Sequence, residues 1–492
     1  MKKISLLITA SILMTLLASC NAAEENTVTG STANETGEKP AASSTGTRLA
    51  PDLQEKDFGG LELTFLSRKI NDAGVSSKHY SEAASEEESG EMMNDAVYKR
   101  NRYIEDKYNV SIKRKLSEDY ASLQSDIKKA VDAEDNSFDA AFASLFDGAN
   151  LSQSNYFVDL NTVPNLDFEK PWWDQRAVEN LSVGGKLYFV TGDITPWTYE
   201  FPTAVIVNKE LIQSYSLEDP YQVVRDNKWT FDKLSEYCKQ SSSDLNGNGE
   251  TDLDDAFGLT LANETFALMF VGGGENFTQK GSGDIPYFAL SSERSAGVAE
   301  KLYGIFTDQK SVLKLENYRG LDFEGLRNNF RKGNTLFYAT WMSTIVLYRD
   351  LDIDIGLLPQ PKYDSAQETY SHPISDYWAT VLVIPSTNNK LAETGFILEA
   401  LCAESMYTVR PAYYESTFKN KGLRDENSEE MLDIILDSLT YDLGRTYDWG
   451  GIAGTIGSIG AAKSFAYSSA IEQRADAVNK AIERTMAQFG VE

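Results

Sequence analysis

The chain has 492 residues and a formal net charge of −28, with 74 acidic against 46 basic residues. This acidity excludes a nucleic-acid binder, which needs a basic surface to displace counterions from phosphates, and disfavours contact with anionic membrane surfaces. Hydrophobic residues make up 41% of the chain, enough for a core, and the length corresponds to roughly two to four domains. Two His and three Cys leave little material for zinc sites or His-dependent catalytic triads.

The N-terminus predicts secretion. Two lysines precede an apolar run over residues 4–18, which is typical of a signal peptide and too short to span a membrane. The run ends in Leu-Ala-Ser-Cys, which resembles the lipobox of bacterial lipoproteins, whose Cys is lipidated. We therefore predict a signal peptide over residues 1–19 and a lipid anchor on Cys20. The anchor would hold the protein at the extracellular face of the cell membrane, or in the periplasm of a cell with an outer membrane. An ordinary signal peptide with a chance Cys is the alternative.

Residues 20–50 have the composition of a tether. Ser, Thr, Ala, Gly, Asn and Glu dominate this segment, and it contains no aromatic residue. Such a segment cannot bury enough apolar surface to fold. We interpret it as a disordered connection between the lipidated Cys and the folded body.

Beyond the tether, strands and helices alternate. The strands predicted first are 61–66, 110–114 and 138–143, and the helices predicted between and after them are 91–108, 119–133 and 147–154. Repeated β-α-β order predicts a mainly parallel sheet covered by helices, with ligands bound beyond the carboxyl ends of the strands. Arg68 and Asp147 follow such strands and are candidate ligand contacts.

The second half continues this pattern. Further strands are predicted at 185–190, 204–208, 336–339, 353–358 and 379–384, and further helices at 391–403, 428–439 and 469–489. Thr230 is suited to cap another helix, whose first turn contains Asp232. Cys238 and Cys402 fall among apolar residues in helical patterns, and we interpret both as buried thiols. An extracellular compartment would also permit a disulfide between them.

Residues 244–255 match the EF-hand calcium pattern, with oxygen-bearing side chains at loop positions 1, 3, 5, 9 and 12 and Gly at position 6. The candidate metal ligands are Asp244, Asn246, Asn248, Glu250 through its backbone carbonyl, Asp252 and Asp255. The final Asp in place of Glu is similar to a dockerin-type loop, and the Asn at position 5 removes one charge, so we expect weak affinity. We predict a structural Ca²⁺ that staples the loop and no catalytic cofactor. A turn without metal is the alternative.

Several segments, taken in order, resemble those of carbohydrate-type extracellular solute-binding proteins, the family that includes maltose-binding proteins and serves ABC importers. The segments that carry this resemblance over roughly residues 55–490 are 138–160, 204–211 (AVIVNKEL), 228–234 (KWTFDKL), 330–341 (FRKGNTLFYATW), 355–361 (IGLLPQP) and 379–390 (ATVLVIPSTNNK). The match at 330–341 is partial, because Leu336 and Phe337 stand where the family has Ala-Met.

The resemblance implies a fold class and a domain arrangement. The fold would be an α/β, two-lobe fold of the type II periplasmic-binding-protein kind, in which each lobe is a mainly parallel sheet flanked by helices and hinge strands join the lobes. Lobe 1 would comprise residues 51–203 plus 377–412, and lobe 2 residues 204–376 plus 413–492. The two thiols would then lie in different lobes, which argues against a disulfide. We expect a monomer.

Aromatic and acidic residues near the predicted strand ends favour a sugar ligand. Carbohydrate binding uses flat aromatic faces against C–H surfaces and planar polar groups against hydroxyls. Besides Arg68 and Asp147, the candidates are Trp172, Trp173, Trp197, Glu200, Asn263, Glu264, Trp341, Asp376, Trp378, Tyr447 and Trp449. Trp341 also matches the family pattern. Packing in the core or on a lobe surface is the alternative for the aromatic groups, because Trp is usually well buried. An ordinary surface turn is the alternative for Arg68 and Asp147.

Three function classes fit these observations. The first is a non-enzymatic lipoprotein that captures a sugar or oligosaccharide in an interlobe cleft and delivers it to the permease subunits of an ABC transporter. The second is the same scaffold with a peptide, a polyamine or a metal chelate as its ligand. The third is a secreted glycosidase, which needs two carboxylates about 5 to 9.5 Å apart, and no motif singles out such a pair. We expect the first.

Overall fold

The computed structural model describes residues 48–69, 80–119, 121–348, 353–420 and 425–491. The predicted signal peptide, the lipid anchor on Cys20 and nearly all of the tether lie outside the described residues. Residues 49–492 form one compact unit, to which all the helices and strands below belong. Within the described part of the chain, no helix has the length and apolar character that crossing a membrane requires.

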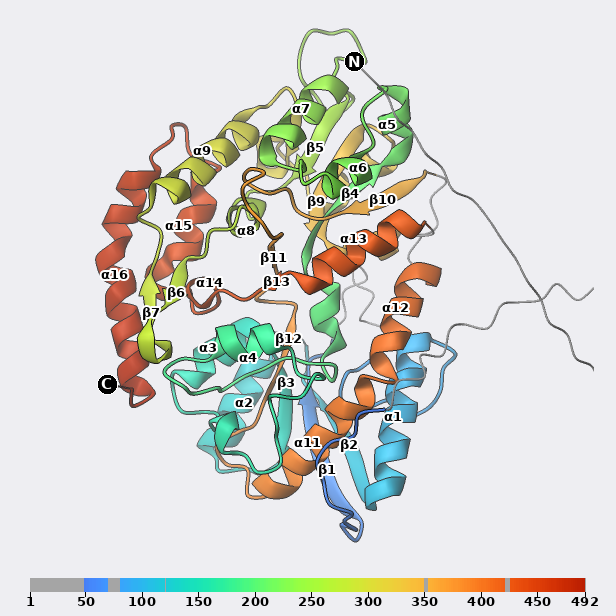
Figure 1. The fold of residues 1–492 in the computed structure, drawn as a ribbon, viewed down its shortest axis with the longest axis vertical. Coiled ribbons are helices and arrows are strands. Elements are labelled where there is room, and N and C mark those ends of the chain that lie inside the picture. Colours follow the sequence, from blue (N-terminus) through green and yellow to red (C-terminus); the bar gives the residue numbers. More distant parts are fainter. Residues whose placement is uncertain (1–47, 70–79, 120, 349–352, 421–424, 492) are drawn as a thin grey trace, which may run out of the picture. The chain divides into compact units, whose positions relative to one another are not determined.

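A four-stranded sheet in the order β12-β3-β1-β2 forms the first half of the unit (Figure 1). Its strands are β1 (Leu61–Ser67), β2 (Val110–Leu116), β3 (Ala140–Ser144) and β12 (Thr380–Val383). β1 pairs in parallel with β2 and β3, whereas β12 runs antiparallel to β3. Every residue of β3 is buried, as expected for a strand covered on both faces. The predicted strands at 61–66, 110–114, 138–143 and 379–384 are confirmed.

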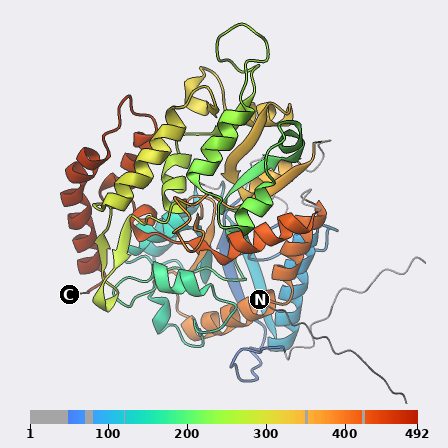
Figure 2. The ribbon, with the colours of Figure 1, turned by 45° about the horizontal axis from the view of Figure 1, so that its top comes forward.

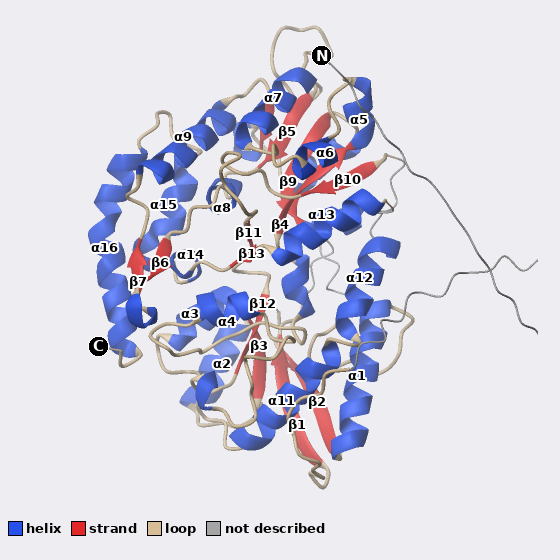
Figure 3. Cartoon of the chain, in the orientation of Figure 1, coloured by secondary structure: helices blue, strands red, loops and turns tan. Residues whose placement is uncertain are grey.

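Helices flank this sheet (Figure 3). They are α1 (Met92–Tyr108), α2 (Leu123–Asp132), α3 (Leu145–Ser152), α4 (Gln175–Leu181), α11 (Leu391–Ser405) and α12 (Val409–Asn420). α1 packs on α11 and α12, so the C-terminal part of the chain returns to cover the first sheet. Local sequence signals set the ends of α1, because the Glu91 side chain caps its start and Asn109 ends it in the left-handed region at φ 52°.

A five-stranded sheet in the order β10-β4-β9-β5-β8 forms the second half. Its strands are β4 (Thr203–Asn208), β5 (Phe257–Leu261), β8 (Val312–Lys314), β9 (Thr335–Trp341) and β10 (Ile355–Leu358). β5 pairs in parallel with β8 and β9, whereas β4 runs antiparallel to β9 and β10. The antiparallel strands, β4 here and β12 in the first sheet, follow the segments that pass from one sheet to the other.

Seven helices surround the second sheet in the described residues: α5 (Lys209–Ser214), α6 (Pro220–Arg225), α7 (Phe231–Ser241), α8 (Thr265–Gly272), α9 (Glu293–Thr307), α10 (Phe323–Arg331) and α13 (Glu426–Asp437). The predicted cap of α7 is confirmed, since the Thr230 side chain accepts a hydrogen bond from the backbone N–H of Lys233. Trp229, just before this cap, is fully buried and its indole donates to the carbonyl of Pro359.

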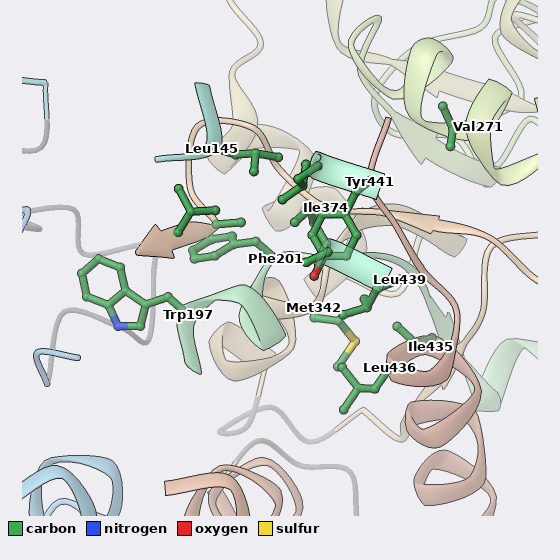
Figure 4. Close-up of a cluster of buried hydrophobic side chains, with 14 of the residues drawn as sticks. Leu145, Trp197, Phe201, Val271, Met342, Ile374, Ile435, Leu436, Leu439 and Tyr441 are labelled. Atoms are coloured by element: carbon green, nitrogen blue, oxygen red, sulfur yellow. The ribbon is translucent and has the colours of Figure 1, made fainter. Parts of the chain in front are cut away.

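Segments that connect the two sheets meet between them. One leads into β4, and another runs from β11 (His372–Pro373) to β12. Beside them, β13 (Leu439–Thr440) pairs in parallel with β11. Figure 4 shows Phe201, Ile374, Leu439 and Tyr441 close together at this crossing. All four side chains are buried, so an apolar cluster holds the connecting segments together.

A hairpin from the middle of the chain lies beside the C-terminal helices. The hairpin is β6 (Thr278–Lys280) with β7 (Pro286–Phe288), and the helices are α14 (Leu443–Thr446), α15 (Ile452–Ile459) and α16 (Tyr467–Gln488). The long helix α16 packs on α15, α9 and β7, and Figure 2 shows it in red along one side of the unit. The predicted helix at 469–489 is thereby confirmed.

The predicted strand at 185–190 is wrong. The structure has only isolated bridges there, between Val183 and Lys186 and between Val190 and Leu382. Leu187, Phe189 and Val190 are buried, which produces a strand-like hydrophobic pattern, but the segment has no neighbouring strand to pair with along its length.

Cys238 and Cys402 are both buried and free, which confirms their interpretation as buried thiols. Burial raises the pKa of the Cys238 thiol, so this group stays protonated near neutral pH.

Candidate ligand-binding site

Two adjoining cavities lie at the edge of the second sheet where the carboxyl ends of β5 and β9 meet. The first has a volume of about 490 Å³ and is lined by the acidic side chains of Glu264, Asp322 and Glu324, so we name it the acidic chamber. The second has a volume of about 450 Å³ and is lined by Gly454 and Gly457 of α15 with other small residues, so we name it the small-residue chamber.

Strand ends position the boundary between the chambers. Trp341 is the last residue of β9, and Glu264 follows shortly after β5. Because β5 and β9 are parallel, both residues lie at the same edge of the sheet. Together with Leu268 of α8 they line both chambers, so the cavities adjoin. On the segment between β11 and β12, Asp376 lines the small-residue chamber and Trp378 the acidic chamber.

Aromatic rings are available to a ligand in these chambers. Trp341 and Trp378 are both half-buried. Trp378 stacks on Phe201, with the ring centroids 6.0 Å apart and an interplanar angle of 21°. Tyr377 is 61% exposed and its ring centroid lies 5.0 Å from that of Phe146. The site therefore presents flat apolar faces of the kind that pack against the C–H faces of a sugar ring.

The acidic chamber carries an excess of negative charge. Among its lining residues, Arg327 is the single basic one, and its guanidinium donates to Glu324 at 2.9 Å. Partial burial raises the pKa of the Glu264 carboxyl, and the nearby negative charge of Glu316 raises it further. The Glu264 carboxylate is already partly desolvated, so a ligand that donates hydrogen bonds to it has less water to displace.

An ion pair lines the small-residue chamber. Arg445 is 7% exposed and its Nη2 lies 2.6 Å from Oδ2 of Asp376. The same nitrogen donates to the carbonyl of Ile374, while the hydroxyl of Thr446 donates to the other oxygen of Asp376 at 3.3 Å. Arg445 lies on α14 and Asp376 lies on the segment between β11 and β12, so the ion pair holds these two parts of the chain together.

Several buried polar atoms at the two chambers have no hydrogen-bond partner within the described residues. They are Thr203 Oγ1 and Gln360 Oε1 in the acidic chamber, and Asn263 Oδ1 and Arg445 Nη1 in the small-residue chamber. An unsatisfied buried polar group costs about 1 to 3 kcal/mol. Because these atoms include donors and acceptors, they favour a ligand whose groups can both donate and accept, as hydroxyls do.

Residues 101–406 match the family described as bacterial extracellular solute-binding protein. The chain belongs to this family. A comparison with curated proteins finds no significant match.

Solved structures similar to this solute-binding protein span nearly its whole folded part. The GacH receptor of Streptomyces glaucescens, described unliganded and with acarbose, is 13% identical with a TM-score of 0.54, covering 86% of this chain and 99% of its own. The domain MalE of Bdellovibrio bacteriovorus, bound to maltotriose, is 13% identical with a TM-score of 0.51, covering 86% and 100%. UgpB of Mycobacterium tuberculosis, with glycerophosphocholine, is 12% identical with a TM-score of 0.54, covering 87% and 99%.

These likenesses show the fold. The chain has the two-lobe α/β fold of type II periplasmic-binding proteins, which confirms the fold class that the resemblance implied. The family is one of solute-binding proteins, so binding, not catalysis, is the activity of the chain, and the family acts outside the cytoplasm. The exact lobe boundaries stay predictions.

Part of the predicted binding set lines the chambers of the solute-binding protein. The residues are Asn263, Glu264, Trp341, Asp376 and Trp378. They come from the ends of β5 and β9 and from the segment before β12, three places distant in sequence. The structure therefore brings these five together at one cleft, and direct contact with a ligand stays a prediction for each.

Arg68 lies beside the site and does not line either chamber. It is buried, and its guanidinium donates to the carbonyls of Tyr377 at 2.7 Å and Trp378 at 2.8 Å and to the hydroxyl of Thr380 at 2.6 Å. Its place in the fold is therefore to hold the segment that presents both aromatic rings. Asp147, in the first turn of α3, is also absent from the lining of both chambers, and it accepts a hydrogen bond from Gln124.

The other aromatic candidates lie in the interior. Trp172 and Trp173 are each 1% exposed, and both indoles donate to Glu399 at 2.9 Å. Trp197 and Glu200 are buried beside the crossing, and Tyr447 stacks on Trp449 with centroids 4.9 Å apart. These six residues are buried, as large side chains usually are, and none of them lines either chamber, so ligand contact stays a prediction for each.

The predicted calcium loop forms an ordered turn with its side chains bonded within the loop. Asp244 accepts from the backbone of Gly247 at 2.7 Å and Gly249 at 2.8 Å, and both glycines have positive φ. The remaining candidates also bond inside the loop: Asn246 and Asn248 donate to Asp252, the backbone of Glu250 donates to Asn248, and Asp255 accepts from two backbone groups. Among the described residues, no group of three or more His, Cys, Asp or Glu is arranged to hold a metal. Calcium binding stays a prediction.

Sequence reasoning missed part of the cleft. Phe201, Gln360 and Arg445 line it, as do the glycines of α15. Tyr377 could have been found, because it lies between two residues that were predicted. Arg445 had no comparable signal, since it lies far along the chain from its partner Asp376 and follows no predicted strand of the sheet.

Proposed function

We propose that this solute-binding protein captures a sugar or oligosaccharide in the two chambers and delivers it to the permease subunits of an ABC importer. The observation that carries the proposal is the pair of half-buried indoles, Trp341 and Trp378, in a cleft that also holds carboxylates and unpartnered polar atoms. Acarbose and maltotriose in two of the similar structures support a carbohydrate. Glycerophosphocholine in a third shows that this fold also binds other solutes, so the choice of sugar rests on the cleft.

Closure around the ligand would couple capture to delivery. The cleft is built from the second sheet, through Trp341 and Glu264, and from the segment that leads back to the first sheet, through Asp376 and Trp378. A ligand that contacts both parts binds the closed form better and shifts the population toward it. A lipid anchor on Cys20 would keep this closed form close to the permease. The lobes that close would be residues 51–203 plus 377–412 and residues 204–376 plus 413–492.

A cationic solute is the second candidate. The acidic chamber has three carboxylates against one guanidinium, and this excess would attract a polyamine. The aromatic faces suit either ligand, because a cation also binds over an indole. A screen therefore has to contain both classes.

Thermal-shift measurements on the purified protein would test the proposal. The screen would contain glycans, polyamines and peptides, each at millimolar concentration. We expect one or more sugars to raise the melting temperature, because a ligand at 100 times its Kd stabilises the folded state by about 2.7 kcal/mol. Stabilisation by polyamines or peptides with no response to any sugar would overturn the carbohydrate assignment. Mass spectrometry of the same mixtures is expected to show intact sugars, whereas cleavage products would indicate a glycosidase.

A matched pair of aromatic substitutions would locate the binding site. Trp341→Ala removes a ring from the boundary of both chambers, and we expect the sugar response to disappear. Tyr287→Ala removes a ring that is 47% exposed on β7 and lines neither chamber, so this control is expected to keep the response. Equal responses in the two variants would show that the sugar binds elsewhere.

A further inference from the structure

The two chambers differ in chemistry. The acidic chamber holds three carboxylates, an arginine and several aromatic rings. The lining surface of the small-residue chamber is mainly apolar, with Ala267 and Leu268 of α8 on one side and Ala453 of α15 and Ala461 just beyond α15 on the other. Its charged lining residues are Glu264, at the boundary with the acidic chamber, and the ion pair of Asp376 with Arg445. A sugar that filled both chambers would place hydroxyls against the apolar surface of the second chamber. There these hydroxyls would lose the hydrogen bonds that they make with water.

Helix α15 leaves the second chamber open through its small residues. A Cβ added to Gly454 or Gly457 would meet no atom within 4 Å, so both positions border free space. Gly inside a helix costs about 1 kcal/mol relative to Ala, and two such positions on one short helix weaken α15. The two glycines leave the chamber its volume of about 450 Å³, and they make α15 less stable than alanines would.

A buried donor at the chamber wall indicates a ligand group. The Arg445 side chain is more than nine-tenths buried, and its Nη1 has no hydrogen-bond partner within the described residues, while Nη2 is paired with Asp376. The carboxylate of Asp376 already offsets the positive charge of Arg445. The free N–H therefore suits a neutral acceptor oxygen better than a second anion.

From these observations we infer that the ligand is a sugar with an uncharged hydrocarbon substituent, and that the small-residue chamber binds this substituent. The inference rests on the proposed function, because the sugar part would lie in the acidic chamber. The substituent would be flat or slender, would pack on Gly454 and Gly457, and would carry an acceptor oxygen within reach of Arg445. Glycosides with an aryl or alkyl group form the substrate class.

Paired ligands would test this inference on the purified protein. Maltose, cellobiose and xylobiose would each be titrated calorimetrically as the free sugar and as the 4-nitrophenyl glycoside, whose nitro group supplies acceptor oxygens. Burying a phenyl ring in an apolar chamber is expected to tighten binding about tenfold or more. Gly457→Leu and, as a second variant, Gly454→Leu would fill the chamber, and the ratio between glycoside and sugar affinity is expected to fall to within about twofold.

Gly304→Leu is the matched control. Gly304 also lies in a helix, α9, with no atom within 4 Å of an added Cβ, and it lines neither chamber, so the affinity ratio is expected to stay at its original value. Equal affinity for sugar and glycoside in the unmodified protein would overturn the inference alone, as would a ratio that survives both substitutions in α15. Binding of none of the six ligands would count against the proposed function as well.

Discussion

Arg68 shapes the site through the carbonyls that it holds. It bonds to Tyr377, Trp378 and Thr380 from a position outside both chambers. A buried arginine can do this because its planar guanidinium carries several donors in fixed directions. Its role is therefore to position the aromatic segment, and substitution should affect ligand affinity as well as stability.

Replacing Arg68 with Met would test this positioning. Arg68→Met keeps most of the side-chain length and removes every donor, so buried carbonyls lose their partners. We expect a loss of about 2 to 4 kcal/mol in unfolding free energy and at least about tenfold weaker binding of the sugar identified by the screen. Chemical denaturation and calorimetry would measure the two effects. Arg225→Met removes an ion pair at the surface and should change stability by less than about 1 kcal/mol with no change in affinity.

His372 predicts a specific loss of stability in acid. It is fully buried at the crossing, where Nε2 accepts from the backbone of Gln360 at 2.9 Å, and burial lowers its pKa to about 3. The unfolded chain protonates this group near pH 6.5, whereas the folded chain keeps it neutral. The stability that depends on neutral His372 is therefore complete above about pH 6.5 and is lost as the pH falls toward 3.

His372→Gln would isolate this contribution, because its amide oxygen can still accept from Gln360 and does not titrate. Urea unfolding between pH 3 and 8 would be compared for the two proteins. The difference in unfolding free energy should favour the histidine protein most above pH 6.5 and fall by up to about 1.4 kcal/mol per pH unit below it. A difference that is constant across this range would contradict a neutral buried His372.

At the scale of elements, the loop 244–255 is the clearest case of local encoding. Asp244 accepts two backbone N–H groups, and Gly249 takes φ 78° at the tight turn, as its place in the motif predicts. Hydrogen bonds between residues of this one segment fix the turn, so the segment itself specifies it. A cation would compete for side-chain oxygen atoms that already accept these hydrogen bonds.

Calcium addition would decide between a metal loop and a bare turn. With affinity of about 10⁻⁴ to 10⁻³ M, 10 mM Ca²⁺ should stabilise the protein by about 1 to 3 kcal/mol relative to chelator, seen as a higher melting temperature. Asp244→Ala should abolish the response. Asp254→Ala removes a carboxylate from the same loop at a position outside the motif and should retain it. A melting temperature that is insensitive to calcium in all three proteins would show that the turn binds no metal.

For the whole molecule, the arrangement of the cleft predicts closure on binding. The walls belong to the second sheet and to the segment that returns to the first, so a bound sugar would draw the two lobes together. Small-angle X-ray scattering should show a smaller radius of gyration when the protein is saturated with the sugar found in the screen. Trp341→Ala at the same sugar concentration should keep the open value. Identical scattering with and without sugar in the unmodified protein would contradict ligand-driven closure.

The sequence by itself determined most strands of the two sheets, the helices around the first sheet, the cap at Thr230, the turn at residues 244–255 and the family. These depend on hydrogen bonds and hydrophobic periods within a few residues, or on motifs that keep their order along the chain. Periodicity also indicates that a side chain is covered, but it does not say by what. Residues 185–190 therefore matched a strand pattern although no neighbouring strand pairs with their full length.

Only the tertiary structure decided which aromatic residues reach the cleft. Trp172 and Trp341 have similar local sequence signals, yet Glu399 holds the first in the core and the carboxyl end of β9 places the second at the cavity. Arg445 joins the site only because α14 packs against the segment that carries Asp376. A binding site assembled from distant segments depends on how whole elements pack, and this packing is a sum of many long-range contacts that no short stretch of sequence contains.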